Sequence, residues 1–262
     1  MIYFLSDAHL GSLAIERAWV HQKKLIDLLE EMSKDAVSIY MMGDMFDFWM
    51  EYYIHDHGKH QYSPFFKELR KLNKQGIHLH FFTGNHDMWT YGGIEKMSGC
   101  QIHYEPCNIN RYGKSLYLSH GDGVLPSNWQ EIYPKKTVRK IKRFIRLRQW
   151  FHSPFLQFCF RCLPPALGNK FGYGWAKRSR LKELANPCPY KGEDQEELVL
   201  FAKEQEQKGV HHDYYIFGHR HIELDLQIAG GSRVVILGDC FKQWTYAKLD
   251  NKGQLTMHCF ES

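Results

Sequence analysis

The chain has 262 residues, is 44% hydrophobic and 24% charged, and carries a formal net charge of +5. These values are typical of a soluble globular protein with one large domain and an insertion. The apolar run after Met1, Ile2–Leu5, is too short for a signal peptide, and no run of about 18 apolar residues occurs, so the sequence predicts a cytoplasmic protein without a transmembrane helix.

Short apolar strands alternate with amphipathic helices along the chain, which is the pattern of an α/β fold. The predicted strands are Ile2–Ser6, Ser38–Met42, Ile77–Thr83, Ser115–Ser119, Tyr214–Phe217 and Val234–Leu237, followed by a hairpin of Thr245–Asp250 and Gln254–Phe260. The predicted helices are Trp19–Ser33, Pro64–Lys74, Lys135–Phe151 and Asp194–Gln207. The expected fold class is therefore α/β.

Polar clusters follow five of the predicted strands at the point where each strand ends. They are Asp7-Ala8-His9, Gly43-Asp44 with Asp47 shortly after it, Gly84-Asn85-His86-Asp87, His120-Gly121-Asp122 and Gly218-His219-Arg220-His221. In open α/β sheets the active site lies beyond the carboxyl ends of the strands. We therefore expect these clusters to meet in space, although the first and last lie near opposite ends of the chain.

The clusters contain seven candidate metal ligands, namely Asp7, His9, Asp44, Asn85, His120, His219 and His221. Mixed oxygen and nitrogen ligands suit Mn²⁺, Fe²⁺ or Zn²⁺ better than Ca²⁺. Seven ligands are too many for one tetrahedral ion but are right for two ions that share a carboxylate. Two ions about 3.5–4 Å apart can clamp a phosphate for in-line attack. The sequence therefore predicts a two-metal phosphoester hydrolase.

Each cluster alone has an ordinary explanation as a loop or a turn. Taken together as Asp7-x-His9, Gly43-Asp44-x-x-Asp47, Gly84-Asn85-His86-Asp87, His120-Gly121-Asp122 and Gly218-His219-x-His221, they resemble the five motifs of the calcineurin-like metallophosphoesterases. The resemblance spans residues 7 to 221. It implies a four-layer αββα sandwich, in which two β-sheets are flanked by helices.

The resemblance also implies a role for each residue. Asp7, His9, Asp44 and His221 would hold the first ion, and Asn85, His120 and His219 would complete the second site with Asp44 as the bridge. The ions would be two divalent metals, Mn²⁺ before Fe²⁺ or Zn²⁺. His86 would act beside the phosphate and Asp87 would orient His86, whereas Asp47 would support the site without being a ligand.

A basic segment lies between the fourth and fifth clusters. From Pro126 to Lys182 there are 14 Lys or Arg residues and one acid, Glu131, so this segment carries +13 and the rest of the chain −8. The polar face of the helix predicted at Lys135–Phe151 consists of Lys135, Lys136, Arg139, Lys140, Lys142, Arg143 and Arg146. A basic amphipathic helix suits an anionic membrane surface. An apolar aromatic run, residues 151–167, follows that helix.

This segment predicts a division of the chain into a core, residues 1–125 and 190–262, and a helical insertion, residues 126–189. The insertion is expected to cover the metals as a lid, and Lys177, Arg178, Ser179 and Arg180 are its candidate substrate-binding residues, beside Asn85 and His86 of the core. The cysteines are expected to be reduced. Cys159 and Cys162 are expected to be buried packing residues rather than a redox or metal pair.

The segments Tyr3–Gly11 and Gly43–Trp49 resemble the UDP-2,3-diacylglucosamine hydrolase branch of this superfamily. That resemblance implies cleavage of a lipid-linked nucleotide sugar to 2,3-diacylglucosamine 1-phosphate and UMP in lipid A biosynthesis. It also implies a peripheral protein on the cytoplasmic face of the bacterial inner membrane. The position after Asn85 is His86 here, whereas within the branch it can be Arg. Phe46, Phe48 and Trp49 fit core packing and substrate contact equally well.

Three alternatives remain open at this stage. A phosphodiesterase or phosphatase of the same superfamily would act on a soluble nucleotide or another phospho-substrate. A nuclease would bind nucleic acid through the segment 126–182 and its aromatic residues, although its Phe/Leu/Cys-rich run is more apolar than a stacking surface requires. A membrane-binding scaffold would keep the metals for structure alone. The sequence indicates no stable protein partner.

Overall fold

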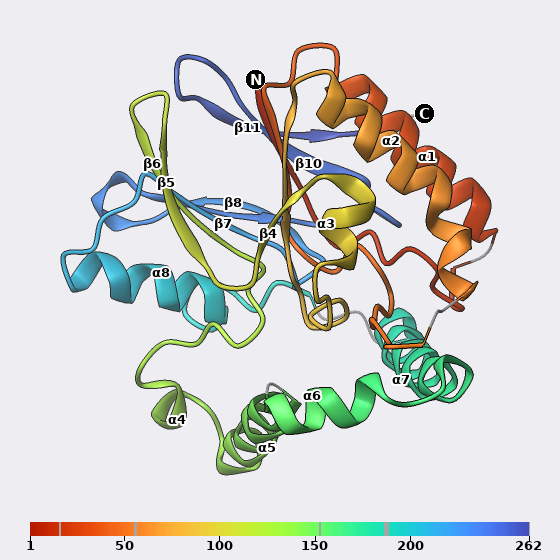
Figure 1. Ribbon diagram of the computed structural model, residues 1–262. Helices are drawn as coiled ribbons and strands as arrows, with labels where there is room; N and C mark the ends of the chain where they lie inside the picture. The colour runs from red at the N-terminus through yellow and green to blue at the C-terminus, as the bar shows by residue number, and fades with distance from the viewer. Residues whose placement is uncertain (16, 55–56, 152, 186–188, 262) are drawn as a thin grey trace.

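A computed structural model describes residues 1–15, 17–54, 57–151, 153–185 and 189–261 (Figure 1). Its larger sheet has six strands in the order β11-β10-β1-β2-β3-β4. Their bounds are β1 (Ile2–Leu5), β2 (Ser38–Met41), β3 (His78–Phe82), β4 (Gln101–His103), β10 (Thr245–Leu249) and β11 (Leu255–Cys259). Strands β1 to β4 run parallel, so their carboxyl ends meet at one edge. Strand β10 pairs antiparallel with β1, and β11 pairs antiparallel with β10.

The second sheet has five strands in the order β5-β6-β7-β9-β8. Their bounds are β5 (Cys107–Arg111), β6 (Lys114–Ser119), β7 (Tyr214–Phe217), β8 (Glu223–Gln227) and β9 (Arg233–Leu237). The three central strands β6, β7 and β9 are parallel. The loops after β6 and β7 therefore leave this sheet at the same edge, where they meet the loops of the first sheet.

Helices cover the outer face of each sheet and complete four layers (Figure 1). The first sheet is covered by α1 (Ala18–Met32), α2 (Ser63–Lys74) and α3 (Gly93–Ser98), with the 3₁₀ helix η1 (His57–Tyr62) leading into α2. The second sheet is covered by α8 (Glu197–Gln207), and the 3₁₀ helix η2 (Ala229–Gly231) follows β8. The expected αββα sandwich is confirmed.

The alternation of side chains along β1 shows why these layers form. Ile2 and Phe4 point into the apolar core between the two sheets. Tyr3 and Leu5 point to the opposite face and pack with residues of α1 and α2. Successive side chains on a strand face opposite sides, so a strand that is apolar at every position must be buried on both faces.

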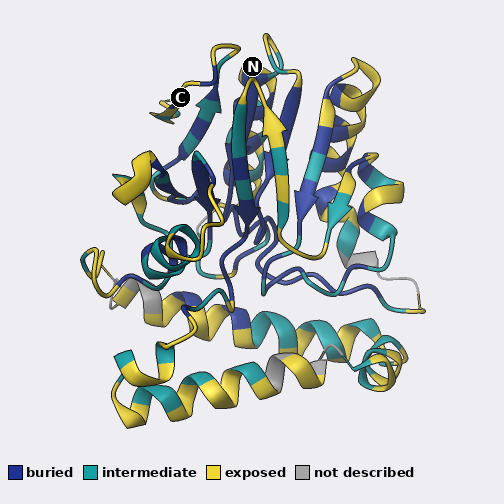
Figure 2. Cartoon of the chain, turned by 90° about the vertical axis from the view of Figure 1, so that its left-hand side faces the viewer, coloured by how far each residue is buried: buried dark blue, intermediate teal, exposed yellow. Residues whose placement is uncertain are grey.

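A separate layer of helices lies beyond the carboxyl ends of the strands, below the sandwich in Figures 1 and 2. It consists of α4 (Trp129–Ile132), α5 (Lys135–Phe151), α6 (Pro154–Arg161) and α7 (Pro165–Ala185). It touches the sandwich through a small apolar cluster that includes Phe48, Met50 and Ala176. No helix among the described residues is long and apolar enough to cross a membrane.

The predicted strands and helices are confirmed to within a few residues at their ends. Helix α8 begins at Glu197 instead of Asp194, because Glu196 is in an extended conformation and its carboxylate accepts hydrogen bonds from Arg220 at 2.6 and 3.0 Å. Strands β4, β5 and β8 were not predicted. All three lie at sheet edges, where polar residues interrupt the apolar pattern.

The expectation about the Cys-x-x-Cys pair is wrong. Cys159 and Cys162 are exposed and reduced, because the helices α6 and α7 turn this part of the apolar run away from the sandwich. Cys188 lies outside the described residues. Two of the three aromatic residues after Asp44, Phe46 and Trp49, are core residues with at most 1% exposure.

Candidate metal centre

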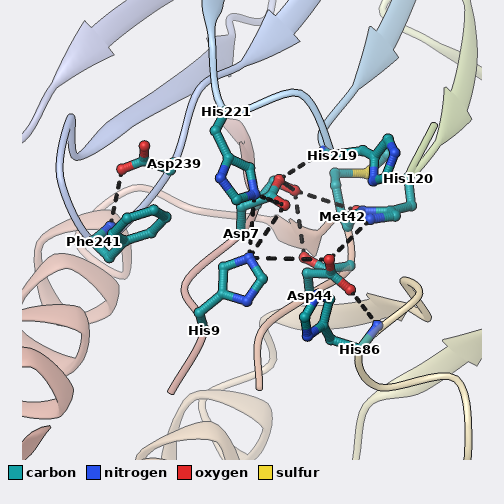
Figure 3. A network of polar contacts seen from close by, with 12 residues as sticks. Asp7, His9, Met42, Asp44, His86, His120, His219, His221, Asp239 and Phe241 are labelled. Atoms are coloured by element: carbon teal, nitrogen blue, oxygen red, sulfur yellow. Dashed lines mark hydrogen bonds and ion pairs between the residues drawn. The ribbon is translucent and has the colours of Figure 1, made fainter. Parts of the chain in front are cut away.

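The strand-end loops of both sheets meet in one buried cluster of carboxylates and imidazoles (Figure 3). Five of the eight non-glycine residues with positive φ in the described part of the chain are in this cluster, namely Asp7, His9, Asp44, His219 and His221. Such backbone conformations cost about 1–3 kcal/mol each and persist where the surrounding structure enforces them, often at functional sites. The chain therefore bends sharply at the end of each strand to bring these side chains together.

Two glycines allow the loops to approach this closely. A Cβ atom on Gly43 would lie 2.4 Å from Nδ1 of His120, and one on Gly84 would lie 2.2 Å from Oδ1 of Asp44. Both distances are far shorter than van der Waals contact. Gly43 also has a φ of +99°, a backbone conformation that residues with a Cβ atom rarely adopt. These two positions therefore require glycine for the cluster to form.

The first group of candidate ligands is Asp7, His9 and His221, whose nearest ligand atoms all lie within 4.8 Å of one another. Nε2 of His221 is 2.9 Å from Oδ1 of Asp7 and 3.2 Å from Nε2 of His9. The other oxygen of Asp7 accepts hydrogen bonds from Oγ of Ser6 at 2.5 Å and from the amide of His219 at 2.8 Å. This arrangement holds one carboxylate oxygen toward the two imidazoles.

The second group is Asp44, His120 and His219. Nδ1 of His120 lies 2.8 Å from the carbonyl oxygen of Met42, which fixes the ring so that Nε2 faces Oδ2 of Asp44 at 3.4 Å. The same oxygen of Asp44 lies 4.0 Å from Nε2 of His9 in the first group. Asp44 therefore stands between the two groups, as a bridging carboxylate would (Figure 3).

Several buried polar atoms in this cluster have no hydrogen-bond partner among the described residues. They include Oδ1 of Asn85 and Nε2 of His120. Leaving a polar atom buried and unpaired costs about 1–3 kcal/mol. A neutral amide oxygen and an imidazole nitrogen are also ligands that a divalent metal accepts. The residues present therefore fit a metal centre, and the two groups, with a third formed by His9, Asp44 and His86, support divalent metal binding.

The ionisation of the carboxylates also fits. Burial alone would raise the pKa of Asp7, but His221 and His9 outweigh it and hold that pKa well below its ordinary value. Burial likewise opposes ionisation of Asp44, and the neighbouring His120 and His86 reverse the effect and lower its pKa. Both carboxylates are therefore charged at neutral pH, the state in which they bind cations.

His86 lies at the edge of the cluster, with its ring 4.9 Å from that of His9. Its amide donates to Oδ1 of Asp44 at 2.8 Å, and its Nδ1 is 2.6 Å from the carbonyl oxygen of Asp47. On the other side the ring meets that of Trp175 from α7, with the centroids 4.9 Å apart. His86 is thus held between the metal cluster and the helical layer.

Asp87 does not contact the His86 ring, so the expectation that it orients His86 is wrong. Its two oxygens accept hydrogen bonds from the amides of Gly84 and Met45, at 2.7 and 2.8 Å. Its carboxylate therefore joins the loops after β2 and β3. Burial, then the charge of Asp44, raises the pKa of Asp87 to about 7. The group that orients His86 is the backbone of Asp47.

Asp47 is fully buried behind His9, with Oδ1 3.4 Å from Nδ1 of His9. A carboxylate in this place orients an imidazole ligand and raises its basicity. Oδ1 also lies 3.7 Å from Nη2 of Arg180, which comes from α7. Nη1 of Arg180 is 3.1 Å from Nδ1 of His221. Arg180 therefore connects the helical layer to His221 directly and to His9 through Asp47.

Of the four candidate substrate-binding residues of the insertion, one lies at the metal cluster and three do not. Arg180 is 2% exposed and lies at the metal cluster. Lys177, Arg178 and Ser179 are exposed on α7, and no contact between them and the cluster is observed in the described residues. Because α7 is a continuous helix, only one side of this basic stretch can face the strand ends.

The loop after β9 also contributes to the site, and the sequence patterns did not identify it. Phe241 packs edge-on against the rings of His9 and His221, at 5.7 and 5.4 Å, and lies 5.0 Å from the Arg180 guanidinium. Asp239 holds this loop by accepting three backbone amide hydrogen bonds. The one from Phe241 is drawn in Figure 3. Gly238-Asp239 repeats the strand-Gly-Asp pattern of the other clusters, which is the signal that could have found it.

Residues 1–223 match the calcineurin-like phosphoesterase family. A Porphyromonas gingivalis protein named "UDP-2,3-diacylglucosamine hydrolase" is 33% identical over 261 residues, which cover 95% of this chain and 94% of that protein. A Haemophilus influenzae protein with the same name is 27% identical and covers 96% of both chains. The solved structure of the Escherichia coli phosphoesterase Yfce is 12% identical, with a TM-score of 0.43 over 99% of both chains. The chain belongs to the calcineurin-like phosphoesterase family.

Proposed function

We propose that the protein hydrolyses UDP-2,3-diacylglucosamine to 2,3-diacylglucosamine 1-phosphate and UMP, in lipid A biosynthesis. The observation that carries the proposal is an apolar cavity of about 370 Å³ beside the metal centre. Its walls include Phe144, Phe160, Phe171 and Trp175 of the helical layer. Asn85 of the metal centre also borders it, so a lipid in this cavity would have its phosphate end at the metals.

The shape of the cavity supports a lipid substrate over a soluble one. Core residues Phe48, Met50, Met88 and Trp89 form its opposite wall. A soluble nucleotide would leave such a surface unfilled, whereas burying acyl chains there contributes about 0.8 kcal/mol per methylene group. The names of the curated relatives, which span several species, support the same substrate.

The chemistry proposed follows from the residues of the site. Asp7, His9, His221 and Asp44 would hold one divalent ion, and Asp44, Asn85, His120 and His219 the other, with Mn²⁺ as the preferred metal. When bound, the ions supply Lewis acidity and an activated water for in-line attack on phosphorus. His86 has its Nδ1 engaged by the Asp47 carbonyl group, which leaves Nε2 to contact the phosphate or the leaving oxygen.

Arg180 is proposed to contact the substrate phosphates from the helical layer. Its guanidinium is buried at the metal centre, and a guanidinium matches phosphate oxygens in charge and in geometry. In this role residues 126–189 form a lid, which closes the apolar cavity and brings one positive charge to the phosphate end. Asn85 and His86 would contact the same phosphates from the core.

The test of the reaction uses purified, Mn²⁺-loaded protein with UDP-2,3-diacylglucosamine in detergent, and measures UMP release. Asp44→Ala and His120→Ala are the inactive controls. UMP release that is lost in both variants supports the proposal. Cleavage of a generic aryl phosphodiester without UMP release would overturn the lipid substrate and favour a soluble phosphodiester. If neither substrate is hydrolysed while the metals are bound, the membrane-binding scaffold is favoured.

We also propose that the protein binds the cytoplasmic face of the inner membrane through the helical layer. Lys135, Arg139, Lys142, Arg143 and Arg146 lie along one side of α5 and border a groove of about 520 Å³. No ion pair involves these five side chains in the described part of the chain. Nearby in sequence, Trp150, Phe155 and Phe158 are 58%, 72% and 55% exposed. Cations beside exposed aromatic residues suit an anionic membrane interface.

The membrane proposal is tested by co-sedimentation with vesicles that contain phosphatidylglycerol. Binding should weaken as salt rises, because surface charges are screened. The double variant Lys142→Glu with Arg143→Glu should bind less than wild type. Arg111→Glu with Lys252→Glu is the matched control, because the end of β5 and the β10–β11 turn that hold these residues lie at the far end of the sandwich from α5 (Figure 1). Equal binding at low and high salt would contradict the electrostatic part. Salt-dependent binding of DNA instead of vesicles would favour a nuclease.

A further inference from the structure

A second, polar cavity borders the metal centre at His120. It has a volume of about 200 Å³ and lies between the end of β3, at Phe82 and Thr83, and the end of β6, at Ser119 and His120. The connection from β4 to β5 closes it. This cavity shares His120 with the metal centre, whereas the apolar cavity shares Asn85. The two cavities therefore border different candidate ligands of the second ion.

The walls of the polar cavity have a distinct chemistry. The Tyr104 ring is 52% exposed, and its hydroxyl donates to the carbonyl oxygen of Thr90 at 3.4 Å, which anchors the ring. His103 is fixed by stacking on Phe82 at 4.5 Å and by a contact of 3.0 Å with His80. The rings of Tyr104 and His103 are thus already oriented, so a planar ligand can stack on them without first ordering these side chains.

The polar groups of the cavity are almost all acceptors or hydroxyls. Glu105 and the buried Asp122 contribute carboxylates, and Thr83 and Ser119 contribute hydroxyl groups. No lysine or arginine is among the described residues that line it. A phosphate would be repelled by these carboxylates. A neutral ring with N–H donors and a face for stacking would be bound by them.

We propose that this cavity binds the nucleoside half of the substrate. The inference rests on the proposed function, because it requires a substrate with a lipid on one side of the phosphates and a nucleoside on the other. With the lipid in the apolar cavity and the phosphates at the metals, the nucleoside must leave the metals in another direction. The volume of about 200 Å³ lies below the roughly 300–1,000 Å³ of whole-ligand pockets, so it suits one part of a ligand.

In this arrangement the uracil ring stacks on Tyr104, and its ring N–H donates to a carboxylate of the cavity. Base–aromatic stacking is sequence-tolerant, because every base has a π-face. The carboxylate distinguishes bases, since uracil presents an N–H donor where cytosine presents an acceptor. Tyr104 is thus a binding residue that contributes equally to the ground state and the transition state.

The test compares Tyr104→Ala with wild type, both loaded with Mn²⁺. For UDP-2,3-diacylglucosamine the KM should rise about 5-fold or more at a nearly constant kcat, as expected when a base loses a stacking partner that binds both states equally. Tyr104→Phe, which keeps the ring, should behave as wild type. Tyr112→Ala removes an exposed tyrosine from the turn between β5 and β6 and is the control for surface effects. An unchanged KM in Tyr104→Ala would overturn the proposal.

A second measurement separates this inference from the proposed function. Hydrolysis of bis(p-nitrophenyl) phosphate needs no nucleoside, and inhibition of it by UMP reports on the cavity whichever lipid is cleaved. The Ki of UMP should rise in Tyr104→Ala by the same factor as the KM. If Tyr104→Ala fails to fold, Glu105→Gln is the second variant, and it should also raise the Ki of UMP. If the wild-type protein releases no UMP from UDP-2,3-diacylglucosamine but UMP still inhibits its hydrolysis of bis(p-nitrophenyl) phosphate, only the lipid substrate is overturned. Equal Ki values in wild type and both folded variants would overturn the nucleoside site.

Discussion

Arg180 and His221 meet at the metal centre, with Nη1 of the guanidinium 3.1 Å from Nδ1 of the imidazole. The two residues come from different parts of the fold, one from α7 of the helical layer and the other from the loop after β7. Asp47 and Phe241 enclose the same guanidinium. The position of α7 and the geometry of the first ligand group are therefore coupled.

Replacing Arg180 with Ala should weaken metal binding at the first group. Arg180 pairs with Asp47, the carboxylate behind His9, and a supporting partner of this kind typically contributes about 10–100-fold in metal affinity. Arg180→Ala is therefore expected to lose metal within that range in a chelator competition titration, and to raise the KM for the lipid substrate. Arg178→Ala changes an exposed residue of the same helix and is the matched control. A metal affinity equal to that of wild type would show that Arg180 does not position the ligand.

Gly172 of α7 packs closely against Phe48 of the core. A Cβ atom there would lie 2.2 Å from the Phe48 ring, so Gly172→Ala must displace the helix or the ring. Overpacking of this kind costs about 1–3 kcal/mol. The variant should raise the KM for the lipid substrate while hydrolysis of a small aryl diester continues.

Gly174→Ala is the matched control for that variant, since a Cβ atom at Gly174 meets nothing within 4 Å. It should leave both activities unchanged and stabilise the helix by up to about 1 kcal/mol. Thermal unfolding measured by circular dichroism, together with the two activities, distinguishes the variants. Equal KM values in both would mean that close packing of α7 on Phe48 is not needed for lipid binding.

Removal of the metals should lower the stability of the protein without unfolding it. The three apolar clusters of the sandwich contain none of the candidate metal ligands, so they keep the fold when the metals are chelated. A ligand present at 100 times its Kd stabilises by about 2.7 kcal/mol. The Tm should therefore fall on chelation and recover on addition of Mn²⁺, whereas Asp44→Ala should show a much smaller response. A Tm that does not respond to Mn²⁺ in wild type would contradict the metal centre.

His80 should make the stability depend on pH. It stacks on Tyr40 at 4.1 Å, and burial, followed by the nearby His103 and His78, lowers its pKa to about 4. An unfolded histidine has a pKa of about 6.5, so between these values the unfolded state binds more protons. The stability contributed by neutral His80 is therefore present above about pH 6.5 and is lost as the pH falls toward 4.

Urea unfolding of the metal-free protein at pH 7.5 and pH 5 tests this prediction. His80→Phe should lose less stability between the two pH values than wild type does. His258→Phe, which replaces an exposed histidine, should lose as much as wild type. If His80→Phe and wild type lose the same amount, burial does not hold His80 neutral.

Local patterns in the sequence were sufficient for the strands that are buried on both faces. Strand β1 is apolar at every position and β2 nearly so, and a Gly-Asp or Asp-x-His turn follows each strand, so both the strand and its polar end are visible without any neighbour. The edge strands β5 and β8 carry polar residues at alternate positions. Their pairing depends on a neighbouring strand, which local patterns do not contain.

The sequence by itself determined which residues could bind metal, because the ligand types and the turns that present them are adjacent along the chain. Only the tertiary structure decided which atoms support those ligands. It placed the backbone of Asp47, rather than Asp87, at His86, and it brought Arg180 and Phe241 to the first group. Such contacts join segments that are far apart in the chain. They depend on the direction in which each helix and loop leaves the sheets, and no local periodicity encodes that direction.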